Sequence, residues 1–476
     1  MNQGRKPKMR GAQDARPGGA PLRGTGGDPR GAHSGRLGRI QDRLVDAATL
    51  VLGGTPVDRA LDEIYTRARD LGSSERAQIN GAIYDLVRNR RRLEDLLARA
   101  AKAQKKKLET LEAPIRARLM LLALLVDRGQ AAEVVEASDP YAAKRIQGLV
   151  PALISARAKI VERLDTKERI AIEASLPDWF AGRLIADFGE ARAYEIAMAL
   201  LERAPLSLRV NRLKSSRDQA LAQIQKAHDP KAVAGQLSPD AILLSEHRSI
   251  TGWTEVEEGL VEVQDEGSQL LALATGAQAG MVVYDACAGA GGKTLALAAM
   301  MENRGRLVAF DREATKLSEL MRRARRAGIT THESHEQDFV TLPQSFLARA
   351  DVVLVDAPCS GTGTLRRQPD ARGRLTEEDV GAFTPWQGSL LSRAVDATRP
   401  GGFVVYATCS LLKSEGEDIV GRVLSQDSRL EPAPLAEVFG EALSARLSAT
   451  YQARIGPGPT ALDPDGFYVA RLRRKP

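Results

Sequence analysis

One stretch constrains the fold of this chain more than any other, because it joins a buried strand to a polar turn that contains glycine. Residues 352–355 read Val-Val-Leu-Val, which is typical of a strand buried on both faces of a parallel sheet. The sequence Asp-Ala-Pro-Cys-Ser-Gly-Thr-Gly follows at 356–363. Open α/β sheets bind ligands at the carboxyl ends of their strands, so Asp356 and Cys359 lie where chemistry is expected.

Two further segments have the same construction. Residues 403–407 predict a strand, and Thr-Cys-Ser follows at 408–410. Residues 282–286 predict another strand, which leads into Cys-Ala-Gly-Ala-Gly-Gly-Lys-Thr at 287–294. The chain has three cysteines, and each lies just past one of these strands. Three cysteines cannot all pair, and their position beside glycine turns is typical of reduced thiols in a cytoplasmic protein.

The C-terminal part of the chain, residues 263–476, predicts alternating strands and helices. Strands are expected at 282–286, 306–310, 351–355 and 402–407, and helices near 292–301, 313–327, 386–398 and 415–425. This alternation predicts a doubly wound α/β sheet with right-handed crossovers. Residues 465–472 predict a final strand at an antiparallel edge of that sheet.

The rest of the chain divides into three segments by composition. Residues 1–36 are rich in Gly, Arg and Pro, and predict a disordered basic arm that either solubilises the chain or contacts an RNA backbone. Their net charge of +6, out of a formal +7, leaves the remainder near neutral, so any nucleic-acid surface there must be a local patch. Residues 37–158 predict an all-α bundle with its most apolar helix at 113–126, and residues 159–262 predict a small α+β linking domain.

Basic side chains outside the arm are candidates for contact with nucleic acid. Residues 206–212 alternate apolar and polar side chains, which predicts a strand with an exposed face that carries Arg209 and Arg212. Such a face could meet backbone phosphates, although a solvated strand face explains it equally well. The same two readings apply to a basic cluster in the helical region, formed by Arg88, Arg90, Arg91, Arg92 and a lysine triplet at 105–107.

The glycine loop at 289–292 is placed between a strand and a helix, where glycine lets a ligand approach the backbone. Dinucleotides, nucleotides and adenosyl cofactors all use such a loop, but the spacing here is neither G-x-G-x-x-G nor that of a P-loop. Asp311 ends the next strand, where an acidic side chain accepts hydrogen bonds from ribose hydroxyls. Asp338, between the strands expected at 306–310 and 351–355, is a candidate contact to an adenine amino group, with a helix cap or turn as the alternative.

The cysteines at the strand ends suit a reaction that needs a thiolate. Pyrimidine C5 is a poor nucleophile, but a thiolate that adds to C6 makes C5 enamine-like, so C5 can accept a methyl group before the thiol is eliminated. A carboxyl group must assist at N3 and the exocyclic amine of the base, and Asp356 is placed for this task. The alternative is that cysteines are small core residues; it holds for Cys287, whereas the polar turns around Cys359 and Cys409 argue against it.

These motifs resemble the RsmB/Sun-type RNA cytosine-C5 methyltransferases, over about residues 175–475. The matching segments are Gln-Asp-Glu-Gly-Ser at 264–268, Cys-Ala-Gly-Ala-Gly-Gly-Lys at 287–293, 356–363 with Leu-Arg-Arg at 365–367 and Pro-Asp at 369–370, Thr-Cys-Ser at 408–410 and Asp-Gly-Phe at 465–467. Residues 74–93 resemble, more loosely, a NusB-type RNA-binding helical domain.

The resemblance implies S-adenosylmethionine as methyl donor and structured RNA as substrate, with 16S ribosomal RNA indicated by the helical N-terminal domain. It implies that Cys409 is the nucleophile and that Cys359 helps to release the product. The implied cofactor contacts are Cys287, Ala288, Gly289, Ala290, Gly291, Gly292, Lys293, Asp311, Asp338 and Asp356. Arg366 and Arg367, within the matching motifs, join Arg209 and Arg212 as the expected RNA contacts.

The chain lacks a histidine that the family often has ahead of the final Asp-Gly-Phe, and it departs from the family pattern at two places within or near the other motifs. The family usually has Ala-Pro before Gly-Gly-Lys, where this chain has Gly289 and Ala290, so the loop is less constrained. The family usually has Glu-Asn-Glu after the Thr-Cys-Ser motif, where this chain has Glu-Gly-Glu at 415–417. Gly416 cannot make the side-chain contact that asparagine would. Neither departure touches the two cysteines.

The sequence therefore predicts a Rossmann-like α/β methyltransferase domain, preceded by an all-α NusB-like bundle and an α+β linking domain. The expected protein is a cytoplasmic monomer with no metal ion and no membrane span that methylates ribosomal RNA. One alternative is a DNA cytosine-C5 methyltransferase in which Cys359 is the nucleophile, although such enzymes do not need Cys409. The other is an RNA-binding ribosome-assembly factor with an inactive methyltransferase domain, which the retained Asp311, Asp356 and both cysteines argue against.

Overall fold

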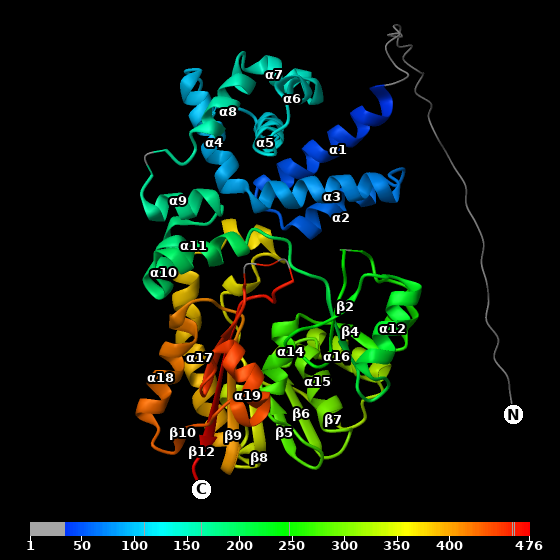
Figure 1. Cartoon of the computed structure of the whole chain (residues 1–476), viewed down its shortest axis with the longest axis vertical. Helices are drawn as coiled ribbons and strands as arrows, with labels where there is room; N and C mark the ends of the chain where they lie inside the picture. Colours follow the sequence, from blue (N-terminus) through cyan, green and yellow to red (C-terminus); the bar gives the residue numbers. More distant parts are fainter. Residues whose placement is uncertain (1–33, 109, 163, 247, 459, 461) are drawn as a thin grey trace, which may run out of the picture.

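The computed structural model describes residues 34–476, except 109, 163, 247, 459 and 461. Figure 1 shows an all-helical unit at one end of the molecule and a large sheet with its covering helices at the other. The predicted basic arm lies outside the described residues up to residue 33, and residues 34–36 already belong to the first helix. Within the described residues, no helix is both long enough and apolar enough to cross a lipid bilayer.

The helical unit is built around one apolar helix, α5 (Ala113–Asp127). This helix buries side chains on all sides, as its sequence predicts, because the neighbouring helices enclose it in a single apolar core. The helices around it are α1 (Ser34–Leu52), α2 (Val57–Arg67), α3 (Ser73–Arg88), α4 (Arg90–Ala103), α6 (Ala132–Ser138), α7 (Pro140–Arg145) and α8 (Leu149–Ala158).

The linking region has two parts with separate apolar cores. The helices α9 (Thr166–Glu173), α10 (Asp178–Phe188) and α11 (Glu190–Ala199) pack against Leu365, Leu411 and Leu412 from loops of the C-terminal domain. The second part is a four-stranded antiparallel sheet in the order β2-β3-β1-β4. Its elements are β1 (Ser207–Val210), α12 (Arg217–Ala227), β2 (Val233–Ala234), β3 (Ala241–Leu243), α13 (Thr254–Glu257) and β4 (Val261–Val263).

The C-terminal domain holds an eight-stranded sheet in the order β10-β12-β9-β8-β5-β6-β7, with β11 also paired to β12. The five strands from β7 to β9 along this order are parallel, and β12 runs antiparallel to β9. From the neighbouring central strands, the sheet continues to opposite sides: β6 and β7 follow β5 on one side, and β9 follows β8 on the other. A ligand is therefore expected in the crevice between β5 and β8. The strands are β5 (Val282–Asp285), β6 (Arg306–Asp311), β7 (His332–Glu336), β8 (Ala350–Asp356), β9 (Thr398–Thr408), β10 (Leu430–Pro432), β11 (Gln452–Ile455) and β12 (Phe467–Arg474).

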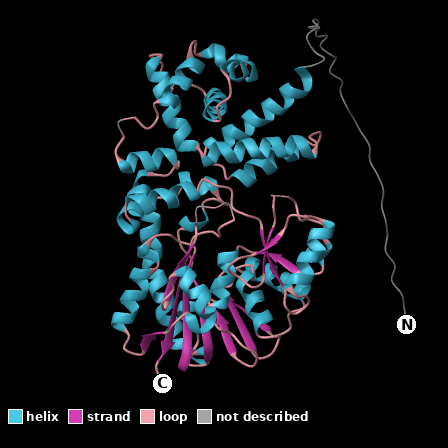
Figure 2. Ribbon diagram, in the orientation of Figure 1, coloured by secondary structure: helices cyan, strands magenta, loops and turns pink. Residues whose placement is uncertain are grey.

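Helices cover both faces of this sheet, which makes it a Rossmann-like α/β fold, and Figure 2 shows its strands apart from those of the small sheet. One face shares its apolar core with α14 (Glu266–Leu273), α15 (Gly292–Met300), α16 (Ala314–Ala327) and α19 (Ala436–Leu447). The other face packs against α17 (Glu377–Ala397) and α18 (Glu417–Gln426). Short 3₁₀ turns complete the domain: η1 (Phe339–Thr341), η2 (Gln344–Phe346), η3 (Thr362–Thr364), η4 (Pro369–Gly373) and η5 (Lys413–Glu415).

Three features of this domain differ from the sequence prediction. α17 begins at Glu377 rather than near 386, because Thr376 and Asp379 form a capping box and Pro385 is accommodated inside the helix. The strand β7 was absent from the predicted set, because its sequence His-Glu-Ser-His-Glu has no apolar pattern. β12 is antiparallel as predicted, but it is not an edge strand, because β10 and β11 pair with its outer side.

Candidate active site

The two cysteines singled out by the sequence meet at the carboxyl edge of the sheet. Cys359 lies in the turn after β8 and Cys409 directly follows β9, and these strands are parallel neighbours. The two Sγ atoms are 3.4 Å apart, and both thiols are partly accessible. The hydrogen bond to Cys409, burial, and the charges of Cys409 and Glu415 raise the pKa of the Cys359 thiol well above its usual value. The pair therefore shares one partly open site.

The turns that carry the cysteines are fixed by a close backbone contact. The N–H of Gly363 donates to the carbonyl of Cys409 over 2.9 Å, and the N–H of Gly466 donates to the carbonyl of Gly363 over 2.9 Å. A Cβ atom at Gly363 would lie 1.9 Å from the carbonyl oxygen of Gly466, so only glycine fits there. The Asp-Gly-Phe motif before β12 thus packs directly against both cysteine turns.

Asp356 ends β8 beside the cysteines and binds a lysine from the glycine loop region. The Nζ atom of Lys293 is 2.6 Å from Oδ2 of Asp356, and both side chains are largely buried. Burial lowers the pKa of Lys293, but the charge and hydrogen bond of Asp356, together with the nearby Cys409, raise it by more. The sequence placed Lys293 among the cofactor contacts and did not reveal that it forms an ion pair with Asp356.

The predicted cofactor loop joins β5 to α15 at the same edge of the sheet. Oδ2 of Asp311, at the end of β6, accepts from the N–H of Gly289 over 2.8 Å, and Oδ1 accepts from the N–H of Glu313 over 2.9 Å. Each oxygen keeps a lone pair for a ribose hydroxyl, and the carboxylate is partly exposed. The loop residues Cys287, Ala288, Gly289, Ala290, Gly291 and Gly292 all lie between this carboxylate and the strand that holds Asp356. This arrangement fits an adenosyl cofactor.

Asp338 follows β7 and caps the short turn η1. Its Oδ1 accepts from the N–H of Val340 over 3.0 Å, which is the capping role weighed against adenine binding in the sequence. The other oxygen is 3.8 Å from Nε of Arg312, and the side chain is partly exposed. The cap therefore occupies one oxygen, and contact with the cofactor stays a prediction for the other.

The buried Asp285 and the partly exposed Cys287 lie where β5 leads into the cofactor loop. Burial raises the pKa of Asp285 to about 6, and this carboxyl accepts a hydrogen bond from Oγ1 of Thr294 over 2.7 Å. Burial and four nearby carboxylates raise the pKa of Cys287 well above its usual value. Cys287 also packs against the apolar core on one face of the sheet. A thiol in these surroundings stays protonated and is not a nucleophile.

The two departures from the family pattern have local physical explanations. A Cβ atom at Gly416 would lie 2.9 Å from Cγ of Tyr468, so the ring of Tyr468 fills the space that an asparagine side chain would need. The less constrained glycine loop is held from outside, because Arg323 Nη1 donates to the carbonyl of Ala290 over 2.8 Å. Both departures are thus compensated by other side chains of this chain.

The RNA contact predicted at Arg366 is wrong. Its side chain is completely buried, and its guanidinium donates to the carboxylate of Asp465, which is buried as well. Arg367 has 29% of its side chain exposed and binds both Asp465 and Asp265, the latter over 2.6 Å. These arginines tie the turn after Cys359 to the start of β12 and to the start of α14. Of these two arginines, only Arg367 stays a predicted RNA contact.

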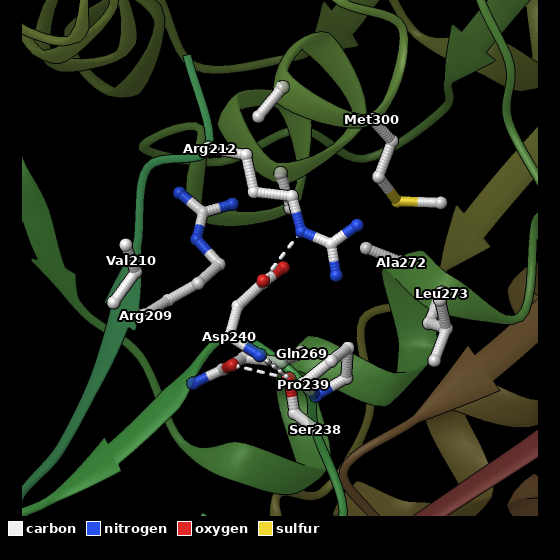
Figure 3. A pocket seen from close by; sticks show the side chains of 12 residues that line it. Arg209, Val210, Arg212, Ser238, Pro239, Asp240, Gln269, Ala272, Leu273 and Met300 are labelled. Carbon is white, nitrogen blue, oxygen red and sulfur yellow. Dashed lines mark hydrogen bonds and ion pairs between the residues drawn. The ribbon is translucent and has the colours of Figure 1, made fainter. Parts of the chain in front are cut away.

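The prediction for Arg209 is also wrong, because its strand has no exposed face. β1 lies between β3 and β4 and is buried along its whole length. Arg209 is 4% exposed, and burial lowers its pKa to about 10. Arg212 is nearly half exposed and forms an ion pair with Asp240 over 2.5 Å. Figure 3 shows both arginines at a small cavity between the small sheet and α14, where Arg212 reaches Asp240.

The arginine cluster of the helical unit is engaged with protein groups rather than free for phosphate. Arg88 donates to the carbonyl of Leu201, and Arg91 binds Asp178 over 2.6 Å, so these two join the helical unit to α10 and α11. The remaining pairs are Arg90 with Glu94 and Arg92 with Asp127, each at 2.8 Å. Two of the four arginines thus join the helical unit to the linking helices, whereas Lys105, Lys106 and Lys107 are exposed and phosphate contact stays a prediction for them.

The short Sγ–Sγ distance predicts that a mild oxidant links the two cysteines. Diamide takes up two hydrogen atoms as Cys359 and Cys409 form a disulfide, which needs the sulfur atoms to close to about 2.05 Å. Intact-mass and peptide mapping should then find one free thiol, Cys287, where there were three. Dithiothreitol should restore all three thiols. Mixed adducts without a 359–409 cross-link would show that the thiols do not face each other.

Asp311 is expected to contribute to cofactor affinity. Replacing it with alanine removes the carboxylate at the end of β6, and a charged hydrogen bond contributes about 1.5–3 kcal/mol, or about 10- to 100-fold in affinity. Isothermal titration calorimetry with S-adenosylmethionine should show a rise of this size in Kd. Glu313→Ala is the matched control, because the side chain of Glu313 is mostly exposed and forms an ion pair with the exposed Lys316. Equal affinities for the two variants would leave Asp311 a purely structural role.

Parallel strands that deliver a glycine turn and three carboxylates to one edge of the sheet define a Rossmann-like methyltransferase that uses S-adenosylmethionine. Residues 271–473 match the family described as 16S rRNA methyltransferase RsmB/F. Residues 176–251 match the ferredoxin-like domain of RsmF/B-like methyltransferases. The chain belongs to the RsmB/F methyltransferase family, which confirms the resemblance seen in the sequence; the likeness of the helical unit to NusB stays a prediction.

Individual relatives support this assignment. Ribosomal RNA small subunit methyltransferase B of Pasteurella multocida is 32% identical over 352 residues, which cover 72% of this chain and 75% of that protein. The methyltransferase homolog protein from Pyrococcus horikoshii is 27% identical, with a TM-score of 0.55, over 65% of this chain and 99% of its own. NSun6 from Pyrococcus horikoshii was solved with SFG, an analogue of S-adenosylmethionine; it is 18% identical, with a TM-score of 0.55, over 63% of this chain and 98% of its own.

Proposed function

We propose that this protein methylates C5 of a cytosine in 16S ribosomal RNA through a covalent bond between Cys409 and C6 of the base. The observation that carries the proposal is the pair of thiols 3.4 Å apart, beside the ion pair of Lys293 and Asp356. One thiolate suffices to activate C5, so a second cysteine at this distance indicates a separate step of the same reaction. The curated relative of Pasteurella multocida is named for ribosomal RNA of the small subunit.

The residues divide the work as follows. The Cys409 thiolate adds to C6, while the carboxyl of Asp356 assists at N3 and the exocyclic amine. Bound S-adenosylmethionine supplies the electrophilic methyl group, which C5 takes up. A base then removes the C5 proton, and the bond between C6 and Cys409 breaks to restore the aromatic base and the thiolate. Lys293 keeps Asp356 in place and lies near Cys409.

Cys359 is suited to the release step. In the free protein, its hydrogen bond with Cys409 and the charge of Cys409 raise its pKa. Once Cys409 is bound to C6, that charge is gone, so Cys359 ionises more readily and can take the C5 proton. Its sulfur lies next to the bond that must break. This order of events makes release dependent on prior attack by Cys409.

The domain arrangement extends the proposal to substrate binding. We propose residues 37–158 as a NusB-like RNA-binding domain, residues 159–262 as a linking and RNA-binding domain, and residues 263–476 as the catalytic domain. Of the predicted RNA contacts, Arg212 and Arg367 retain exposed surface. The linking helices join the helical unit to the catalytic domain, because Arg91 of the helical unit binds Asp178 and Arg372 of the catalytic domain donates to carbonyls of the linking helices. RNA held by the helical unit is thus presented to a catalytic domain fixed against it.

Methyl transfer from S-adenosylmethionine labelled with tritium in the methyl group tests the substrate class. Transcribed 16S ribosomal RNA should become labelled and duplex DNA should not, and digestion should recover the label as 5-methylcytidine. Label on the duplex alone would favour a DNA methyltransferase. Failure to label RNA, DNA or isolated small subunits, while S-adenosylmethionine still binds, would favour an inactive assembly factor.

A further inference from the structure

A fully buried carboxylate lies between the two cysteine turns. Glu415, in η5, has no exposed surface. Its Oε1 accepts from the N–H of Ser360 over 2.9 Å, and its Oε2 accepts from Oγ of Ser410 over 2.6 Å and from the hydroxyl of Ser360. Ser360 directly follows Cys359 and Ser410 directly follows Cys409. One side chain therefore holds the residue after each thiol.

The position of Glu415 is itself fixed by neighbouring elements. Gln387 of α17 donates to Oε1 of Glu415 over 3.1 Å and to the carbonyl of Pro358 over 2.9 Å. The hydroxyl of Tyr406 donates to the carbonyl of Glu415 over 2.8 Å. Among the residues that the structure describes, no lysine or arginine forms an ion pair with Glu415, so hydrogen bonds alone satisfy this carboxylate. A buried carboxylate without a cation is costly to maintain, which points to a task beyond stability.

The charges around the two thiols are unequal. Glu415 accepts two hydrogen bonds from Ser360 and one from Ser410, and its negative charge is among the causes that raise the pKa of Cys359. Lys293 lies near Cys409, and the charge of Cys409 is among the causes that raise the pKa of Lys293. A negative charge disfavours a thiolate and a positive charge favours one. The surroundings thus distinguish two thiols that are otherwise equivalent in chemistry.

We propose that Glu415 is a positioning residue, which holds the two cysteine turns in register and by its charge keeps Cys359 a thiol, so that Cys409 acts as the nucleophile. Its part in methyl transfer rests on the function proposed above, whereas its effect on the two thiols does not. The residue acts through the cysteines and touches neither cofactor nor RNA in this role. Keeping Cys359 protonated until Cys409 has added to C6 prevents both thiols from competing for the base.

The pH dependence of alkylation tests this proposal without RNA or cofactor. Initial rates of iodoacetamide modification at Cys359 and Cys409 are followed by peptide mass spectrometry from pH 6 to 10. In the wild-type protein Cys409 should react about tenfold faster than Cys359 near neutral pH. In Glu415→Gln the midpoint for Cys359 should fall by about one pH unit, and the preference for Cys409 should shrink accordingly. An unchanged Cys359 profile in the folded variant would overturn the proposal.

Two further variants separate charge from positioning. Glu266→Gln is the matched control, because Glu266 is also buried and accepts two backbone N–H groups, from Leu237 and Ser238, outside the cysteine turns. It should leave both alkylation profiles unchanged. Ser360→Ala removes the hydroxyl contact to Glu415 but keeps the backbone N–H contact and the charge of Glu415. It should therefore leave the Cys359 midpoint in place while the kcat for methyl transfer falls about tenfold.

Should Glu415→Gln fail to fold, the Ser360→Ala variant decides the positioning claim alone. An unchanged kcat in that variant, with a fully active wild-type control, would contradict it. A wild-type protein that labels no RNA yet shows the expected alkylation profiles would refute the proposed function and leave the assignment of thiol and thiolate standing.

Discussion

Alanine at Cys409 is expected to abolish methyl transfer and to leave no covalent complex with RNA. Without the thiolate nothing adds to C6, and C5 of a cytosine is too weak a nucleophile to accept the methyl group unaided. The loss should be at least about 10³-fold in kcat, since covalent catalysis is removed altogether. Binding of S-adenosylmethionine should be unchanged, because Cys409 follows β9 and is not among the expected cofactor contacts.

Alanine at Cys359 is expected to have the opposite signature. Attack by Cys409 and methylation should proceed, but release should stall, because the thiol whose sulfur lies 3.4 Å from that of Cys409 is gone. A protein–RNA band that survives denaturation should therefore accumulate on a gel. The double variant should form no such band. A band from Cys409→Ala and none from Cys359→Ala would reverse the assignment and favour the arrangement of DNA methyltransferases.

Replacing Arg366 with methionine is expected to destabilise the catalytic domain by about 3–5 kcal/mol, because it leaves the buried carboxylate of Asp465 with one partner fewer. Both side chains of this ion pair are completely buried. The pair also anchors the segment whose Gly466 binds Gly363, so activity should fall together with stability. Urea denaturation followed by intrinsic fluorescence measures the change in unfolding free energy.

The control for this variant is Arg399→Met. Arg399 binds Asp351 over 2.5 Å, but more than half of its side chain is exposed, so its loss should cost less than about 1 kcal/mol. An Arg366→Met protein with wild-type stability and weakened RNA binding would contradict the structure. It would restore the original reading of Arg366 as an RNA contact.

The large-scale fold follows from local sequence patterns. The apolar strands β5, β6, β8 and β9 and the polar turns behind them are visible as short runs of β-branched residues followed by glycine, and their order determines the sheet. The same patterns place Cys359, Cys409 and Asp356 at one edge. β7 escapes prediction because a polar edge strand carries no such run.

The side-chain partners could not be predicted, because they join residues distant in the chain. Arg366 lies in a polar motif, so its sequence surroundings suggest exposure; its burial depends on Asp465, 99 residues away. In the sequence, Glu415 belongs to the Glu-Gly-Glu segment at 415–417, where only the departure at Gly416 draws attention. Its contact with Ser360 joins residues 55 positions apart. The alternating pattern around Arg209 predicts an exposed strand face, but the same pattern also occurs in a buried strand that holds one arginine, as β1 does.

The central claim, that the reaction occurs at C5 of cytosine, is tested most directly by the fate of the C5 hydrogen. 16S ribosomal RNA is transcribed with cytidine that carries tritium at C5, and the protein is added with unlabelled S-adenosylmethionine. Tritium should enter the water in a one-to-one ratio with methyl groups transferred, and Cys409→Ala should release none. Methyl transfer with all the tritium retained in the RNA would place the methyl group elsewhere on the nucleotide and contradict the account.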